Sequence, residues 1–160
     1  MIKQGNARFC FVCGLENPNG LHLHFYQPAS GEVTARIRIP APFQGWTGVV
    51  HGGVIAAMLD EAAGRAFMEG EQLSRFMFTA KLEVRYRKPV PVDQWLTLVG
   101  RVKEEKGRVS VGTSQIVDAD GTILAEAEAV LVPIPPDQLE KLDFGQEDWK
   151  IIAEEETNQE

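Results

Sequence analysis

Several features that mark membrane, secreted or zinc-dependent proteins are missing from this sequence of 160 residues. No stretch approaches the roughly 18 apolar residues that a membrane-spanning helix needs. The first residues lack the basic and then apolar layout of a signal peptide. Cysteine is scarce, because the chain has only 2, and no second Cys-x-x-Cys pair follows the first. We therefore expect a cytoplasmic protein with no membrane partner and no bound metal.

Positive charge is also in short supply, with 16 lysines and arginines against 23 acidic residues and a net charge of −7. The excess acid lies in residues 134–160, while residues 1–133 carry as many bases as acids. An acidic tail is typical of a solvated appendage and argues against nucleic acid as a partner. The length fits a single domain that is large enough to bury a hydrophobic core. We predict a domain over residues 1–133 and an acidic tail over 134–160 that is partly helical or disordered.

Alternating apolar and polar residues predict six strands, over 21–26, 32–39, 77–87, 95–103, 108–118 and 123–132. Turn residues separate neighbours, as between Pro28 and Gly31 or between Asp118 and Gly121. A short helix is expected over 139–144. This order needs only one sheet, antiparallel and curled around the helix that lies between the second and third strands, which is an α+β arrangement.

That helix, expected over 54–67, is apolar nearly all round, which is typical of a buried helix. Asp60 and Glu61 nevertheless lie in its middle, where a carboxylate is costly unless it is paired or at work. Gly52 and Gly53 precede it and let a ligand approach the first free backbone N–H groups, whose dipole favours negative charge. A helix start that stabilises an oxyanion, with a carboxylate about two turns along, is half of an acyl-transfer site.

The order of these elements and their motifs resembles the hotdog-fold thioesterases, in particular the PaaI-type branch. His51-Gly52-Gly53 opens the helix, and Asp60 follows nine residues after His51. Three further stretches fit that branch: Cys-x-x-Cys-Gly with Asn-Pro-x-Gly-Leu from Cys10 to Leu21, Phe43-Gln44-Gly45, and Thr79-Ala80-Lys81-Leu82 running on to Arg87-Lys88-Pro89. The resemblance covers about residues 9–133 and implies a hotdog fold, a single antiparallel sheet wrapped around one long central helix.

The resemblance also implies an acyl-CoA thioesterase, which hydrolyses a thioester to a free acid and coenzyme A. The amide of Gly52 or Gly53 would polarise the thioester carbonyl and hold the oxyanion. Asp60 matches the catalytic carboxylate, as general base or nucleophile. Thr79 matches a Ser/Thr that the partner subunit contributes beside the carboxylate, and it is expected on the strand face opposite its own helix. His51 matches a histidine that positions the thioester.

Partners follow from the same resemblance. Acyl-CoA is the implied substrate, so coenzyme A arrives as part of it, and neither a metal nor a redox cofactor is implied. Arg85, Arg87 and Lys88 are candidates to contact the coenzyme A phosphates. The family assembles homodimers or homotetramers with active sites at subunit interfaces. Some PaaI-type members have an Asn six residues before the histidine, where this chain has Gly45, and Gln44 is a candidate substitute.

The residues themselves leave alternatives open. Asp60 could pair with Arg65, and His51 could simply cap the helix. Glu61 is a rival carboxylate, turned about 100° around the helix from Asp60. It would suit a hotdog dehydratase, which is one alternative function, and a non-catalytic acyl-CoA-binding protein is another. Trp46 could cover a ligand or fill the core, and we favour the core.

A zinc site can also be drawn from Cys10, Cys13, His22 and His24. Both histidines fall in a predicted strand, however, so we favour two small buried thiols packed in a loop. A disulfide is not expected in a cytosolic protein.

Overall fold

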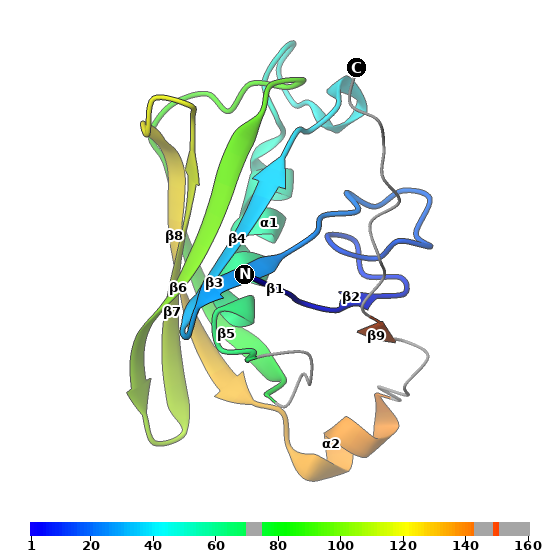
Figure 1. Ribbon diagram of the computed structural model, residues 1–160, viewed down its shortest axis with the longest axis vertical. Helices are drawn as coiled ribbons and strands as arrows, with labels where there is room; N and C mark the ends of the chain where they lie inside the picture. Colours follow the sequence, from blue (N-terminus) through cyan, green and yellow to red (C-terminus); the bar gives the residue numbers. More distant parts are fainter. Residues whose placement is uncertain (70–74, 143–148, 151–160) are drawn as a thin grey trace.

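A computed structural model describes residues 1–69, 75–142 and 149–150, and it is built on a seven-stranded antiparallel sheet curled around one long helix, α1 (Gly52–Arg65) (Figure 1). The strands of this sheet, in spatial order, are β1 (Ile2–Lys3), β3 (Tyr26–Ala29), β4 (Glu32–Ile37), β6 (Leu96–Lys106), β7 (Val109–Val117), β8 (Ile123–Pro133) and β5 (Met77–Tyr86). A second sheet pairs β2 (Asn6–Ala7) with β9 (Trp149–Lys150), and a 3-10 helix, η1, covers Ala41–Phe43. The predicted α+β architecture is confirmed.

The strands predicted after residue 30 form close to their expected bounds, because alternation there reflects burial on one face of the sheet. Val33, Ala35 and Ile37 of β4 are fully buried, while the residues between them are not. The tight turns also form where glycine was expected, since Gly31 and Gly121 have φ of 72° and 79°. Local sequence therefore specified most of the sheet.

The first predicted strand, over 21–26, is wrong in its bounds, because β3 begins only at Tyr26. His22 takes a left-handed φ of 55°, which breaks an extended strand. The amides of Leu21 and Leu23 donate instead to the carbonyls of Phe11 and Val12, at 2.8 and 2.9 Å. The alternation still predicted that Leu23 and Phe25 are buried. The amide hydrogen bonds of Leu21 and Leu23, however, are made within the loop between β2 and β3 and not in the sheet.

Helix α1 approaches the sheet closely because two glycines lie beneath it. A β-carbon on Gly100 of β6 would lie 2.0 Å from the carbonyl oxygen of Ala62, and one on Gly112 of β7 would lie 2.6 Å from that of Ala63. No other residue fits at either position without moving the helix. The sheet-facing residues of α1 are accordingly fully buried, namely Met58, Leu59, Ala62 and Ala63.

The opposite side of α1 differs from the expectation of a helix sheltered all round. Val54, Ala57, Asp60 and Gly64 are only half-buried, and Gly53 is exposed. Strand β5, which follows α1 in the chain, lies at the edge of the sheet and pairs only with β8 among the described strands. In the described part of the chain, one long side of the central helix is therefore only partly covered, and the outer edge of β5 has no partner strand.

The C-terminal region contains α2 (Pro136–Lys141), where a helix was predicted over 139–144. It begins earlier because proline suits the first turn of a helix. Residues 143 and 144 lie outside the described residues, as does most of the acidic tail, so the division at residue 134 stays a prediction. Within the described ranges, no helix combines the length and apolar character needed to cross a membrane.

Candidate active site

The start of α1 presents one free backbone amide. His51 is the N-cap, and its Nδ1 accepts the N–H of Gly53 at 2.9 Å. This is the capping role that the sequence left open, and it places the proton of a neutral His51 ring on Nε2. The Gly52 N–H has no acceptor among the described residues. Of the two candidate amides, Gly52 is therefore the one available to a ligand.

A pocket of about 620 Å³ opens at this end of the helix. It is lined by Trp46, Val49, Val50, Gly52, Gly53, Ile55, Tyr86, Arg87, Lys88, Pro89 and Val90. The hydroxyl of Tyr86 donates to the carbonyl of Gly52 at 2.8 Å, which fixes the first turn of α1 against the end of β5. The expectation that Trp46 fills the core is wrong, because this side chain is 85% exposed at the pocket.

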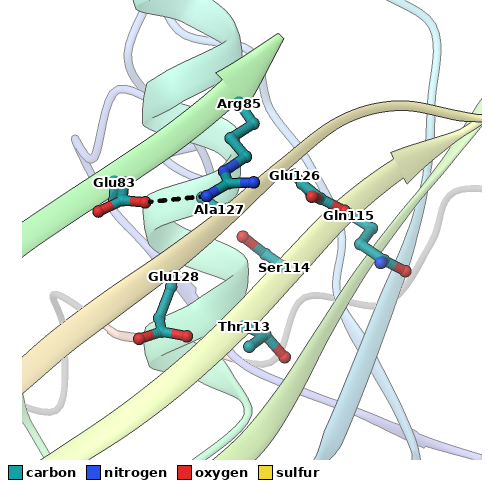
Figure 2. Close-up of a pocket in the computed structure, with 8 residues that line it drawn as sticks. All are labelled: Glu83, Arg85, Thr113, Ser114, Gln115, Glu126, Ala127 and Glu128. Carbon is teal, nitrogen blue, oxygen red and sulfur yellow. Dashed lines mark ion pairs between the residues drawn. The ribbon is translucent and has the colours of Figure 1, made fainter. Parts of the chain in front are cut away.

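The three basic candidates do not lie together. Arg87 and Lys88 line the pocket beside Gly52, although Arg87 also pairs with Glu126. Arg85 lies on the outer face of the sheet, where it lines a separate groove of about 300 Å³. Figure 2 shows its guanidinium directed at Glu83, with 3.7 Å between the charged atoms. Only Arg87 and Lys88 are therefore placed near the free amide.

The carboxylate of Asp60 lies in a second, smaller pocket of about 190 Å³ together with Thr79 and Cys10. The hydroxyl of Thr79 donates to Asp60 Oδ1 at 2.7 Å. This contact is made within one chain, so the expectation that Thr79 faces away from its own helix is wrong. The pair arises between the middle of α1 and the beginning of β5.

A β-bulge explains why alternation misplaced Thr79. In the β5–β8 ladder Thr79 pairs with Leu131 and Lys81 pairs with Val130, so Ala80 is an extra residue without a partner. The bulge puts Thr79 and Leu82 on the same face of β5, towards α1. Phe78, expected on that face, is instead 41% exposed.

Burial raises the pKa of Asp60 above its ordinary value of 3.8, and the negative charge of Glu61 raises it further. The hydrogen bond from Thr79 favours the charged form and opposes both effects. A carboxylate whose pKa is raised towards the working pH is a better proton acceptor than a solvated one. The pKa of Asp60 is therefore shifted in the direction that general-base catalysis favours.

Glu61, the rival carboxylate, is committed elsewhere. Its Oε1 accepts from Nε of Arg65 at 2.8 Å, and Arg65 is only 1% exposed. Its Oε2 accepts from the thiol of Cys10 at 3.1 Å. The alternative ion pair between Asp60 and Arg65 does not form, because Arg65 turns to Glu61 instead.

The two pockets are separate. Gly52 and Asp60 are eight residues apart, which is about 12 Å along a helix. The pocket at Gly52 and the pocket at Asp60 share no lining residue. Within one chain, the free amide and the carboxylate cannot act on the same carbonyl group.

Comparisons with known proteins agree with this architecture. The family model described as "Thioesterase superfamily" matches residues 47–125. This range includes the residues of α1 that line the two pockets. A solved thioesterase superfamily protein superposes with a TM-score of 0.71 and 32% identity, over 78% of this chain and 63% of that chain. This chain belongs to the thioesterase superfamily. Its hotdog fold, expected from the sequence, is confirmed.

Other superfamily relatives are more distant or longer. Acyl-coenzyme A thioesterase THEM4 of Rattus norvegicus is 30% identical over 131 residues, which are 80% of this chain and 55% of the relative. The chain thus spans about half the length of such relatives. A hypothetical thioesterase of Streptococcus pneumoniae, solved with coenzyme A, has a TM-score of 0.63 at 18% identity, over 70% of this chain and 85% of that chain, which supports the fold alone.

The loop before α1 contains Gly45, the position where the PaaI-type resemblance led us to look for an asparagine. Gln44, the candidate substitute for an asparagine, uses its side-chain oxygen to accept the Gly48 N–H at 3.0 Å. A β-carbon on Gly45 would lie 3.3 Å from the Cα and the ring of His51. Position 45 therefore lies directly beside His51, whereas the side chain of Gln44 stabilises the loop before α1.

The four-residue zinc site drawn from the sequence does not assemble as drawn. In the described part of the chain, the close group of potential donors is Cys10, Cys13 and Glu61, within 4.8 Å of one another. Nε2 of His22 contacts the carbonyl of Asn17 at 2.5 Å. Sequence reasoning missed Glu61 as the neighbour of Cys10, because 51 positions separate them and no local pattern links them.

Proposed function

We propose that the protein is an acyl-CoA thioesterase, which hydrolyses a thioester to a free acid and coenzyme A. The observation that carries this proposal is that one helix presents a free amide at Gly52 and a half-buried carboxylate at Asp60 held by Thr79. These are the two halves of a hydrolytic site. The relatives named acyl-coenzyme A thioesterase and the structural neighbour solved with coenzyme A support the same substrate class.

In this mechanism the Gly52 N–H binds the thioester oxygen and stabilises the negative charge that develops on it, which is worth about 3 kcal/mol of the barrier. Asp60 acts as general base or as nucleophile. As base it accepts a proton from water, the oxygen of water bonds to the carbonyl carbon, and the carbon–sulfur bond breaks. The proton then passes from Asp60 to the sulfur, so that coenzyme A leaves as a thiol. Thr79 holds the carboxylate in place, and the exposed Nε2–H of His51 is available to the thioester.

The site is assembled from two chains in this proposal, with Gly52 from one subunit and the Asp60–Thr79 pair from the other. Three observations support it: the separation of about 12 Å within one helix, the half-buried side of α1, and the edge of β5 that pairs with no described strand. An antiparallel pairing of two such helices would bring each amide to the other chain's carboxylate. The active unit is a homodimer, or a homotetramer made of two.

The pocket at Gly52 is suited to the rest of the substrate. Its walls are largely apolar, and Lys88 and Arg87 lie at one side, where phosphate groups would find positive charge. Binding through Arg87 requires competition with Glu126. Arg85 is less suited to a phosphate of the same substrate, since it lies in the groove on the outer face. The chemistry requires no metal or redox cofactor, and the two free thiols fit the expected cytoplasmic location.

A dehydratase that uses Glu61 is disfavoured, because Glu61 is held by the buried Arg65. The remaining competitor is a protein that binds acyl-CoA without turnover. A thiol-release assay over a panel of acyl-CoA thioesters separates the two, combined with a binding measurement for coenzyme A.

In that assay we expect Asp60→Asn to lower kcat by about three orders of magnitude, which is typical of losing a general base, while coenzyme A still binds. Glu61→Gln is the matched control, because it removes the neighbouring charge and keeps hydrogen-bonding capacity. Loss of turnover in Glu61→Gln but not in Asp60→Asn would reverse the assignment. If the unmodified protein binds coenzyme A but releases no thiol from any acyl-CoA thioester of the panel, the proposed thioesterase activity is wrong.

A further inference from the structure

The proposed hydrolysis leaves a cluster of reactive groups unused beside Asp60. Cys10 and Cys13 lie in the loop after β2, and their sulfurs and a carboxylate oxygen of Glu61 are within 4.8 Å of one another. Cys10 is half-buried and lines the same pocket as Asp60 and Thr79. Cys13 is fully buried. The two thiols therefore differ in access to small molecules.

The loop holds the two sulfurs next to each other. The N–H of Gly14 donates to the carbonyl of Cys10 at 2.8 Å, which closes one helical turn over Cys10 to Gly14. Residues three apart in such a turn are neighbours on one face, with β-carbons about 5–6 Å apart, so a disulfide, whose β-carbons lie about 3.5–4.5 Å apart, requires the two residues to approach by about 1–2 Å. A β-carbon on Gly14 would lie 2.4 Å from the backbone of Cys10, so only glycine permits this turn.

The surroundings make Cys10 the better nucleophile of the pair. The amide of Val12 donates to the Cys10 sulfur at 3.4 Å. A hydrogen bond from the Cys13 thiol lowers the pKa of Cys10, against the opposing effects of burial and of Glu61. The same hydrogen bond, together with burial, raises the pKa of Cys13. One thiolate is thus favoured at Cys10, with a protonated thiol behind it at Cys13.

The arrangement fits a metal ion less well. Oε1 of Glu61 is occupied by Nε of Arg65, whose buried positive charge would face any cation bound there. The described residues offer three donors in this group, whereas a structural zinc site takes four.

We propose that Cys10 and Cys13 form a redox-active dithiol that reacts with small hydroperoxides, with Cys10 as the attacking sulfur and Cys13 as the resolving one. The Cys10 thiolate bonds to one oxygen of hydrogen peroxide, and the O–O bond breaks. The sulfur keeps one OH group as a sulfenic acid, and the other leaves as hydroxide, which takes up the proton that the thiol had released and becomes water. The Cys13 sulfur then bonds to the Cys10 sulfur, the S–O bond breaks, and a second water leaves. The product is a disulfide, oxidised by two electrons, which a small dithiol reductant returns to two thiols.

Disulfide formation removes the hydrogen bond from Cys10 to Glu61, next to the proposed catalytic carboxylate.

The test does not use turnover, so it stands or fails independently of the proposed hydrolysis. The full-length reduced protein is treated with hydrogen peroxide, its remaining thiols are alkylated, and peptides are mapped by mass spectrometry. We expect a Cys10–Cys13 linked peptide, lighter by two hydrogens, that dithiothreitol reverses.

The two single variants test the assigned roles. In Cys13→Ser, Cys10 should stop at the sulfenic acid and be trapped by dimedone. In Cys10→Ser, Cys13 should react at least tenfold more slowly than Cys10 does in the other variant. Circular dichroism checks that each variant is folded. The disulfide-mapping experiment uses the unmodified protein, so it tests the proposal even if a variant does not fold.

Three outcomes would overturn the proposal. The first is that peroxide that oxidises free cysteine leaves both thiols of the unmodified protein reduced. The second is equal reactivity of the two single variants. The third is thiols that become reactive only when a chelator releases zinc, which would make the cluster a metal site.

Discussion

The two ends of helix α1 differ in nearly every chemical respect, although they belong to one continuous element. The start has glycines, a free amide, and an open pocket with largely apolar walls and basic residues at one side. The middle and the end carry two carboxylates, two nearby thiols and a buried arginine. The start suits the binding and activation of an electrophile, and the second half suits the supply and control of nucleophiles. In the proposed mechanism, a helix that separates these tasks by about 12 Å contributes one half to each of two sites.

The sharpest way to break this comparison is to remove the amide hydrogen at the start of the helix. Gly52 is the first helical residue, where proline is well tolerated, and His51 already has the extended backbone that a following proline requires. We expect Gly52→Pro to fold normally and to lower kcat by about 10²–10³-fold. Thermal unfolding and the thiol-release assay measure the two effects.

Gly52→Ala is the matched control, since it keeps the N–H and its β-carbon would make ordinary contacts of 3.5 Å with Tyr86. It should retain most of the activity. If both variants lose activity equally, the shape of the pocket rather than the amide is responsible.

Mixing two inactive chains tests whether the halves come from different subunits. Gly52→Pro chains keep the carboxylate and Asp60→Asn chains keep the amide. After unfolding and refolding together in equal amounts, half of the dimers are mixed and each has one intact site. About a quarter of the unmodified activity should return. A return to background only would contradict a shared site and favour one built within a chain.

The smallest expected effect concerns stability at the carboxylate. The pKa of Asp60 is raised in the folded chain by burial, so below pH 3.8 both states are protonated and ionisation carries no penalty. As the pH rises above 3.8, the unfolded chain loses its proton first and folding stability falls. Asp60→Asn cannot ionise and still accepts from Thr79. We therefore expect it to raise Tm at pH 7 by less than about 3 °C, and to give no increase near pH 3.

Much of the fold followed from local sequence, because burial on one face of a strand leaves a period of two. Val33 to Ile37 and the apolar run of α1 are examples, and the order of motifs identified the superfamily. Of the residues singled out on α1, Gly52 has a free amide and Asp60 a half-buried carboxylate, while their catalytic roles stay predictions. The separation of the two pockets follows directly from their spacing in the helix.

Other features had no local signal. Ala80 is an ordinary strand residue, and nothing in its type reveals that it has no partner. The neighbours of Cys10 depend on how a loop folds back over the helix, so Glu61 could not be anticipated. His22 likewise fits a strand by its sequence pattern. In the structure its neighbours Leu21 and Leu23 donate their amides to the preceding loop, and His22 takes a left-handed φ.

The unpaired Ala80 has a consequence for how this chain can change length. Ala80 is the extra residue of the bulge, and Thr79 and Lys81 on either side of it pair with adjacent residues of β8. Deleting Ala80 would close the bulge and make Thr79 and Lys81 neighbours on opposite faces, so the Thr79 hydroxyl would still meet Asp60. If Ala80 were kept but paired regularly, Thr79 would turn outward and Phe78 would turn towards Asp60. Position 80 is therefore a place in β5 where the chain can lose one residue and keep Asp60 partnered.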